Sequence, residues 1–160
     1  MGFNGHGFLH FEAVITSCYS TGNVNGFYVG GLVGVNGSEG SMSNIPGYIN
    51  NSYSTGTVNG ILYVGGLVGA HVWGDIEGSF WDTETSGKLE SDGGTGKTTA
   101  EMQMMSTFTD ANWDFINVWN IGENQTYPYL RTFLAGDINK DGIVNFLDLS
   151  ITANKWMQEQ

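Results

Sequence analysis

A long internal repeat constrains the fold of this chain more than any other feature of its sequence. Residues 18–34 read CYSTGNVNGFYVGGLVG and residues 52–69 read SYSTGTVNGILYVGGLVG, so that Tyr19 corresponds to Tyr53 and the second copy is one residue longer. A third, degraded copy begins at residues 79–82, which read SFWD. A period near 35 residues is typical of units that stack into an array, each burying the face of its neighbour.

The composition of each unit favours short β-strands. Tyr, Val, Ile and Thr dominate, and Gly recurs at intervals that would cost a helix about 1 kcal/mol per glycine. A β-prone segment precedes each copy, at residues 13–16, 47–50 and 74–77. Gly22 and Gly56 each follow Ser-Thr, which predicts turns with a positive φ. The pattern fits a stacked array, and an ordinary Gly-rich antiparallel domain is the alternative.

The two copies resemble the GLUG motif. Its core stands here as Gly31-Leu32-Val33-Gly34 and Gly66-Leu67-Val68-Gly69, each after Tyr-Ser-Thr-Gly, and the resemblance spans about residues 13–82. It implies a mainly β fold, a right-handed parallel β-solenoid in which Tyr19 lies above Tyr53. GLUG repeats occur in large bacterial surface and secreted proteins, including adhesin-like proteins and some immunoglobulin-cleaving peptidases. The resemblance therefore implies an extracellular or cell-surface protein.

Charge and composition exclude several classes of function. Asp and Glu number 16 against 5 Lys and Arg, a net charge of −11, so the chain would repel the phosphates of a nucleic acid. No apolar run approaches the ~20 residues that span a bilayer, so we expect no membrane insertion. The single Cys excludes an internal disulfide and a Cys-based zinc site. No signal peptide is visible, and we expect the chain to be a C-terminal fragment.

The composition changes near residue 75, which suggests differently built parts. Residues 1–74 hold two acids and no bases, whereas residues 75–160 hold 14 acids and all five bases. We expect repeats over residues 1–82, an aromatic-rich connector or cap over 83–133, and a calcium-binding tail over 134–160. Within the connector, Thr98-Thr99-Ala100-Glu101 has the pattern of a capping box that opens a helix through Met105. The connector also resembles the tail that closes GLUG arrays, where its aromatic residues would cover the edge of the last coil.

Three other groups of residues could suggest a ligand-binding or catalytic site, but structural roles explain them better. Residues 93–98, GGTGKT, lack the earlier glycine of a phosphate-binding loop, because Ser91 occupies that position, so we expect no nucleotide and a flexible glycine loop. The histidines are His6, His10 and His71, and no His-Glu-x-x-His motif is present. Cys18 aligns with Ser52 and Ser79, as a small side chain stacked between coils would.

The strongest chemical signal lies in residues 137–148, DINKDGIVNFLD. Oxygen-bearing side chains recur at positions 1, 3, 5, 9 and 12, Gly142 at position 6 permits a sharp turn, and Ile143 at position 7 would offer its carbonyl. This alternation lets a twelve-residue loop wrap one hard cation with six to eight oxygens. The sequence therefore predicts a Ca²⁺ site, with a solvated Asn/Asp turn as the alternative. The candidate ligands are Asp137, Asn139, Asp141, Ile143, Asn145 and Asp148.

The loop is followed by an amphipathic pattern without a helix before it, and this resembles one dockerin type I repeat over about residues 136–158. Dockerins usually pair two repeats, and their recognition positions, often Ser-Thr, are Phe146-Leu147 here. The resemblance implies a cohesin-like partner.

The combined interpretation is a non-catalytic part of a secreted or cell-surface adhesin-like protein, which recognises a surface or polysaccharide ligand and is not an enzyme. A tethered component of a polysaccharide-degrading system and a solenoid enzyme of the pectate-lyase kind are the alternatives.

Overall fold

The computed structural model describes residues 12–38, 45–131, 138–139 and 144–158. The repeats form short strands that fall into three successive layers. The first layer comprises β1 (Ala13–Thr16), β2 (Tyr19–Ser20), β3 (Val24–Gly26), β4 (Val29–Gly30) and β5 (Val33–Asn36). The second layer comprises β6 (Gly47–Asn50), β7 (Tyr53–Ser54), β8 (Val58–Gly60), β9 (Val64–Gly65) and β10 (Val68–His71). The third layer contains β11 (Gly74–Glu77) and β12 (Phe80–Asp82), and β13 (Thr95–Lys97) pairs with β12 beyond it.

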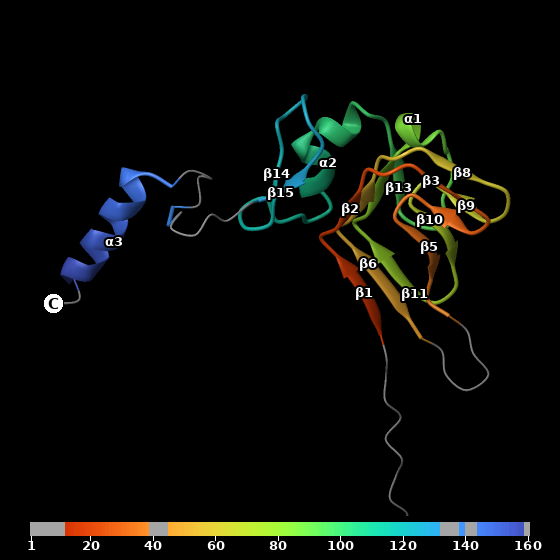
Figure 1. Cartoon of the computed structure of the whole chain (residues 1–160), viewed down its shortest axis with the longest axis horizontal. Helices are drawn as coiled ribbons and strands as arrows, with labels where there is room; N and C mark the ends of the chain where they lie inside the picture. Colours follow the sequence, from red (N-terminus) through yellow and green to blue (C-terminus); the bar gives the residue numbers. More distant parts are fainter. Residues whose placement is uncertain (1–11, 39–44, 132–137, 140–143, 159–160) are drawn as a thin grey trace, which may run out of the picture.

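Each strand of one layer pairs in parallel with its counterpart in the next (Figure 1). The sheets run β1-β6-β11 and β2-β7-β12-β13, and three further pairs join β3 to β8, β4 to β9 and β5 to β10. The register sets Tyr19 opposite Tyr53 and Val29 opposite Val64. The predicted pairing of the copies is thus confirmed, and the antiparallel alternative is wrong for these strands. The extra residue of the second copy lies in the turn between β8 and β9.

A serine ladder joins the layers at the corner before β2, β7 and β12. The Cys18 N–H donates to Ser52 Oγ at 3.1 Å, and the Ser52 N–H donates to Ser79 Oγ at 3.2 Å. Each serine hydroxyl in turn donates to a carbonyl of its own layer, from Asn50 or Glu77. These contacts explain the small polar side chains that the sequence aligns at this position.

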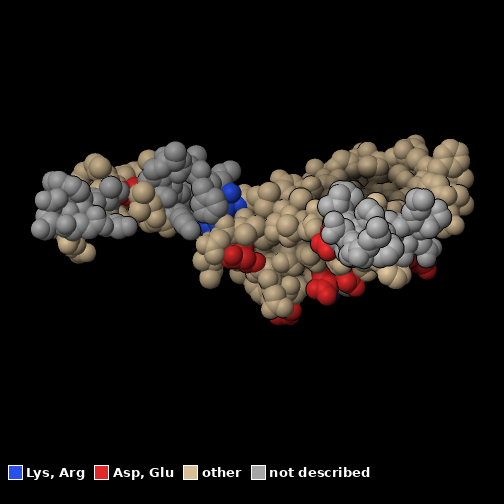
Figure 2. Space-filling model, turned by 90° about the horizontal axis from the view of Figure 1, so that it is seen from below, with Lys and Arg blue, Asp and Glu red and all other residues tan. Residues whose placement is uncertain are grey.

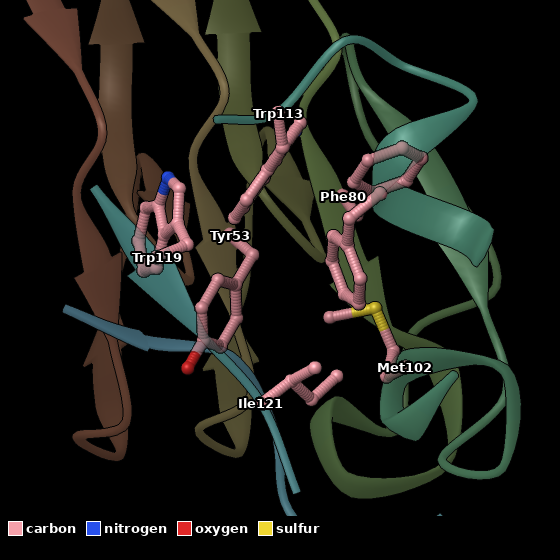
Figure 3. Close-up of a cluster of buried hydrophobic side chains, with 7 residues drawn as sticks. Tyr53, Phe80, Met102, Trp113, Trp119 and Ile121 are labelled. Atoms are coloured by element: carbon pink, nitrogen blue, oxygen red, sulfur yellow. The ribbon is translucent and has the colours of Figure 1, made fainter. Parts of the chain in front are cut away.

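The side chains of the strands contribute to two hydrophobic clusters. One lies among the sheets, where Ile49, Leu67, Val68 and Trp81 meet. The other lies on the opposite face of the β2-β7-β12-β13 sheet, since alternate residues of a strand point to opposite faces. It joins Tyr53 and Phe80 of the sheet to residues of the connector (Figure 3). The connector side chains buried in it are Met102, Phe108, Trp113, Trp119 and Ile121.

The connector contains α1 (Thr83–Ser86), the 3₁₀ helix η1 (Glu101–Gln103), α2 (Met105–Thr109), β14 (Trp119–Asn120) and β15 (Tyr129–Leu130), with β14 and β15 antiparallel. The predicted capping box is confirmed: the Thr98 N–H donates to Glu101 Oε2 at 2.8 Å, and the Glu101 N–H donates to Thr98 Oγ1 at 3.3 Å. The predicted single helix through Met105 is wrong, because Met104 is extended, with φ −100° and ψ 125°, and separates η1 from α2.

The last layer is closed differently from the expectation. Its edge is covered by β13, which pairs with β12. Residues 90–92 belong to the third layer and make backbone hydrogen bonds to Gly66 and Val68 of the second. The connector aromatics instead cover a face of the sheet. The segment expected as a flexible glycine loop is therefore a turn at Gly93 and Gly94, both with positive φ, followed by a strand.

The prediction of positive φ at Gly22 and Gly56 is wrong, since neither adopts it. Gly56 is required by close approach: a Cβ there would lie 1.9 Å from the Gly22 carbonyl oxygen. Gly66 is required for a similar reason, because a Cβ would lie 2.0 Å from Cδ1 of Trp81.

The tail contains helix α3 (Phe146–Gln158), which confirms the predicted helix after the loop. The helix stands apart from the β-layers in Figure 1. With no second repeat to cover the apolar face of this helix, the sequence predicts that Leu149 and Trp156 pack on the connector. Leu149 is 61% exposed, so this prediction is wrong for it. The side chain of Trp156 is outside the described residues.

Replacing Gly66 should destabilise the fold strongly. In Gly66→Ala the new methyl group meets the Trp81 ring, and overpacking of this kind costs about 1–3 kcal/mol. Gly22→Ala is the matched control, because no atom lies within 4 Å of a Cβ at that position. Urea unfolding of both variants measures the difference, and equal midpoints would contradict the close-packing explanation.

Removing a rung of the serine ladder should also destabilise the fold. Ser52→Ala removes a fully buried hydroxyl that accepts from the Cys18 N–H and donates to the Asn50 carbonyl, and losing such hydrogen bonds costs about 0.5–1.5 kcal/mol each. The control is Ser20→Ala, whose hydroxyl makes no hydrogen bond within the described residues. Thermal unfolding should separate the two variants, and a Ser52→Ala melting temperature equal to the control would show that the ladder is dispensable.

Candidate functional site

The predicted calcium loop is described in part. Asp137, Asp141 and Ile143 lie outside the described residues, whereas Asn139, Asn145 and Asp148 lie within them. Among the residues the structure describes, no three His, Cys, Asp or Glu side chains group as metal ligands. The geometry of the loop can therefore be described only around Asn139, Asn145 and Asp148.

Asp148 organises this part of the loop. Its Oδ1 accepts hydrogen bonds from the backbone N–H of Ile138 at 2.7 Å and of Asn139 at 3.2 Å, and its Oδ2 accepts from Asn145 N–H at 2.9 Å. The residue is only 2% exposed because the loop backbone surrounds it. Position 12 of the loop thus lies against positions 2, 3 and 9.

The hydrogen bonds determine the charge state of Asp148. The Asn145 N–H contributes most to lowering the pKa of its carboxyl below the ordinary value of 3.8, and those of Asn139 and Ile138 add to it. Asn145 Oδ1 accepts from Leu147 N–H at 2.7 Å and so caps the first turn of α3. An ionised carboxylate and two amide oxygens are ligands of the kind that Ca²⁺ prefers, so the described residues fit the ion.

A second carboxylate, Asp82, is fully buried and satisfied by neutral donors. Its Oδ1 accepts from the backbone N–H of Glu84 and Thr85, which caps α1, and its Oδ2 accepts from Thr99 Oγ1 and Tyr127 Oη, both at 2.7 Å. Burial, and secondarily this hydrogen bond, raise the pKa of Tyr127. Because Asp82 joins β12, α1 and the connector, the contacts indicate a structural role.

The turns between β3 and β4 and between β8 and β9 form an exposed apolar surface that the sequence reasoning missed. We call it the corner surface; it consists of Phe27, Tyr28, Ile61, Leu62 and Tyr63, all exposed. The rings of Tyr28 and Tyr63 stack with centroids 4.9 Å apart and planes within 11°. A signal existed in the sequence, because apolar residues occupy positions between glycines where a turn is expected.

Shallow pockets lie at two corners of the layers. One is lined by Tyr63, Val64, Gly69, Glu90, Ser91 and Asp92. The other is lined by Tyr48, His71, Val72, Trp73, Gly74 and Asp75. His71 Nδ1 in the second lies 3.0 Å from Asn36 Nδ2, so its ring is paired with an amide. On the face that Figure 2 shows, acidic side chains stand in a few groups on a mostly uncharged surface.

Comparison with known proteins shows that the chain is similar to part of a much longer bacterial protein. The chain is 40% identical over 122 residues to a protein of Evansella cellulosilytica named a putative Gly-rich membrane protein. The match covers 69% of this chain and 13% of that protein, so the chain spans a small part of the relative's length. No protein-family model matches the chain, and no solved structure matches it. Within the described residues, no helix has the length and apolar character needed to cross a membrane.

The stability of the loop should depend on pH through Asp148. Its pKa is lower in the folded loop than in the unfolded chain, so its contribution is complete above about pH 4 and is lost as the pH falls through the folded value. In metal-free buffer, amide NMR signals of Ile138 and Asn145 should titrate together below pH 3.8. The control, Asp110→Asn, should leave the titration unchanged, and Asp148→Asn should remove it. Signals that stay constant through this range would contradict the described loop.

Proposed function

We propose that this chain is a non-catalytic binding segment of an adhesin-like protein of the bacterial cell envelope. In this proposal the layers are a GLUG-type, right-handed parallel β-solenoid, and the tail is a dockerin-like calcium module. The observation that carries it is the corner surface: the first two parallel layers hold apolar turn residues in fixed positions facing solvent, where Phe27 is 66% exposed. Contiguous exposed apolar surface on a rigid framework is typical of interaction sites.

Two further observations support an envelope location. The relative from Evansella cellulosilytica is named a Gly-rich membrane protein, and it is much longer than the matched region. The strong excess of acids suits an extracellular setting, where millimolar calcium is available to carboxylate loops. An antibody raised against the chain should label intact cells that express the complete protein, and protease treatment of those cells should remove the label. Labelling that requires permeabilised cells would contradict the proposal.

A tethering role is the second candidate, and α3 favours it. The helix leaves Phe146, Leu147 and Leu149 exposed, so its apolar residues have no cover in the described structure. In a dockerin-like module such a face would meet a cohesin-like partner, here with Phe146-Leu147 at the recognition positions. Retention of the chain on an immobilised cohesin in calcium, abolished by chelator, would favour this role over the adhesin-like one.

The calcium site gives a direct prediction for the tail. Asp137, Asn139, Asp141, Asn145 and Asp148 would supply side-chain oxygens and Ile143 its carbonyl. Extracellular loops of this type bind with dissociation constants of about 10⁻⁴ to 10⁻³ M. At about 10⁻⁴ M affinity and about 1 mM calcium, binding stabilises the loop by about 1.4 kcal/mol.

Calorimetry checks this prediction with two variants. Asp137→Ala should abolish calcium binding because it removes a full charge, whereas Asn145→Ala should weaken it less, since position 9 often coordinates through water. Asp110→Asn, outside the loop, should bind as the wild type does. A wild-type chain that gives no heat with several millimolar calcium would remove the site.

A further inference from the structure

The third layer is shorter than the second at the corner surface. Gly66 follows Tyr53 by 13 positions in the second layer. In the third layer Glu90, whose carbonyl accepts from Gly66 N–H, follows Phe80, which pairs with Tyr53, by only 10 positions. Helix α1 occupies part of this shorter segment. Its Thr85 carbonyl accepts a hydrogen bond from Thr57 Oγ1 of the second layer at 3.2 Å. The third layer therefore has no counterpart of the turn between β8 and β9.

This omission leaves a notch beside Tyr63. One face of the Tyr63 ring stacks on Tyr28 of the first layer, and the residue remains 55% exposed. The pocket lined by Tyr63, Val64, Glu90 and Asp92 lies between the second layer and residues 90–92 of the third. A third aromatic ring would continue the stack here, but none of the described residues supplies one.

The backbone of Tyr63 is held in an unusual conformation. Its φ is +39°, in the left-handed region that a tyrosine rarely adopts, whereas Tyr28 in the corresponding turn does not have a positive φ. The difference follows from the extra residue in the second copy, which lengthens this turn. Such conformations cost about 1–3 kcal/mol and cluster at ligand sites, where they fix the direction of a side chain.

The polar groups of the notch differ in whether they already make hydrogen bonds within the protein. Ser91 Oγ accepts from the N–H groups of Leu67 and Val68 and donates to the Val68 carbonyl, so it is not available to a ligand. Asp92 Oδ2 accepts from His71 N–H at 2.6 Å, which fixes the carboxylate in place. The Glu90 carboxylate makes no hydrogen bond within the described residues. The notch thus offers acceptors from Glu90 and Asp92 beside an aromatic platform.

We propose that the notch binds a single sugar ring of a neutral polysaccharide. The apolar face of the ring stacks on Tyr63 as the third member of the aromatic column, and its hydroxyl groups donate to Glu90 and Asp92. A neutral sugar fits better than an acidic one, because the lining has two carboxylates and no Lys or Arg, and the chain carries −11. An apolar peptide fits less well, since it would remove the Glu90 carboxylate from water without a donor.

This inference rests on the proposed binding function and names its ligand class. Affinity electrophoresis of the full chain tests it, in native gels containing hydroxyethylcellulose, xylan or glucomannan, with polygalacturonate as the acidic probe. The wild type should be retarded by at least one neutral polysaccharide and not by polygalacturonate. Tyr63→Ala should weaken that retardation about tenfold, which corresponds to about 1.4 kcal/mol of stacking. Tyr63→Phe should retain it, and Glu90→Gln should weaken it a few-fold.

Tyr129→Ala is the matched control, because Tyr129 is an exposed tyrosine outside the corner surface and does not line the notch. Retardation that falls equally in Tyr129→Ala and Tyr63→Ala would overturn the site, as would retardation by polygalacturonate or by none of the probes. Unfolding midpoints confirm that each variant is folded, and Tyr63→Phe tests the ring without altering the turn. The cell-labelling experiment is independent, so an envelope protein without this site would label cells and fail in the gels.

Discussion

Close backbone contact between parallel layers is the constraint on which the rest of the structure depends. Strands about 4.8 Å apart bond layer to layer only if the segments between them also stack, and at several positions the layers then approach too closely for a Cβ. A Cβ at Gly31 would lie 2.4 Å from the Gly66 carbonyl oxygen, and one at Gly56 would meet Gly22. The glycines therefore hold the register, and the register places every other repeated side chain.

The aromatic cluster packs the connector firmly against the stacked strands. Tyr53 stacks on Tyr19 at 5.3 Å and packs against Trp113 and Trp119, and its hydroxyl donates to the Pro128 carbonyl. Burial raises the pKa of this phenol, which therefore stays protonated. Trp119 is fully buried, with an Nε1 atom that has no partner in the described residues, a cost that the packing of its ring offsets.

Features that recur in both copies could be predicted from the sequence, whereas features that depend on differences between the copies could not. Identical residues at a fixed offset were enough to predict that Tyr19 pairs with Tyr53, because parallel stacking aligns equivalent positions. The sequence predicts a positive φ at Gly56. Its close approach to Gly22 was missed, because that contact joins residues distant in the chain. The connector was harder, because Met104 interrupts a helix that its capping box begins. Spacing alone predicts the calcium loop, which stays a prediction, whereas the notch depends on a length difference between layers that can be seen only in the folded structure.

Length differences between the layers can appear only at the corners. Serine bonds, glycine contacts and paired strands fix the rest of each layer, so an inserted residue changes the turn between β8 and β9 and a deletion removes the turn above it. Both changes meet at Tyr63, which the insertion turns to a positive φ and the deletion leaves uncovered. A repeat array acquires a distinct site in this way without altering its core, because its turns are free of the constraints that its strands obey.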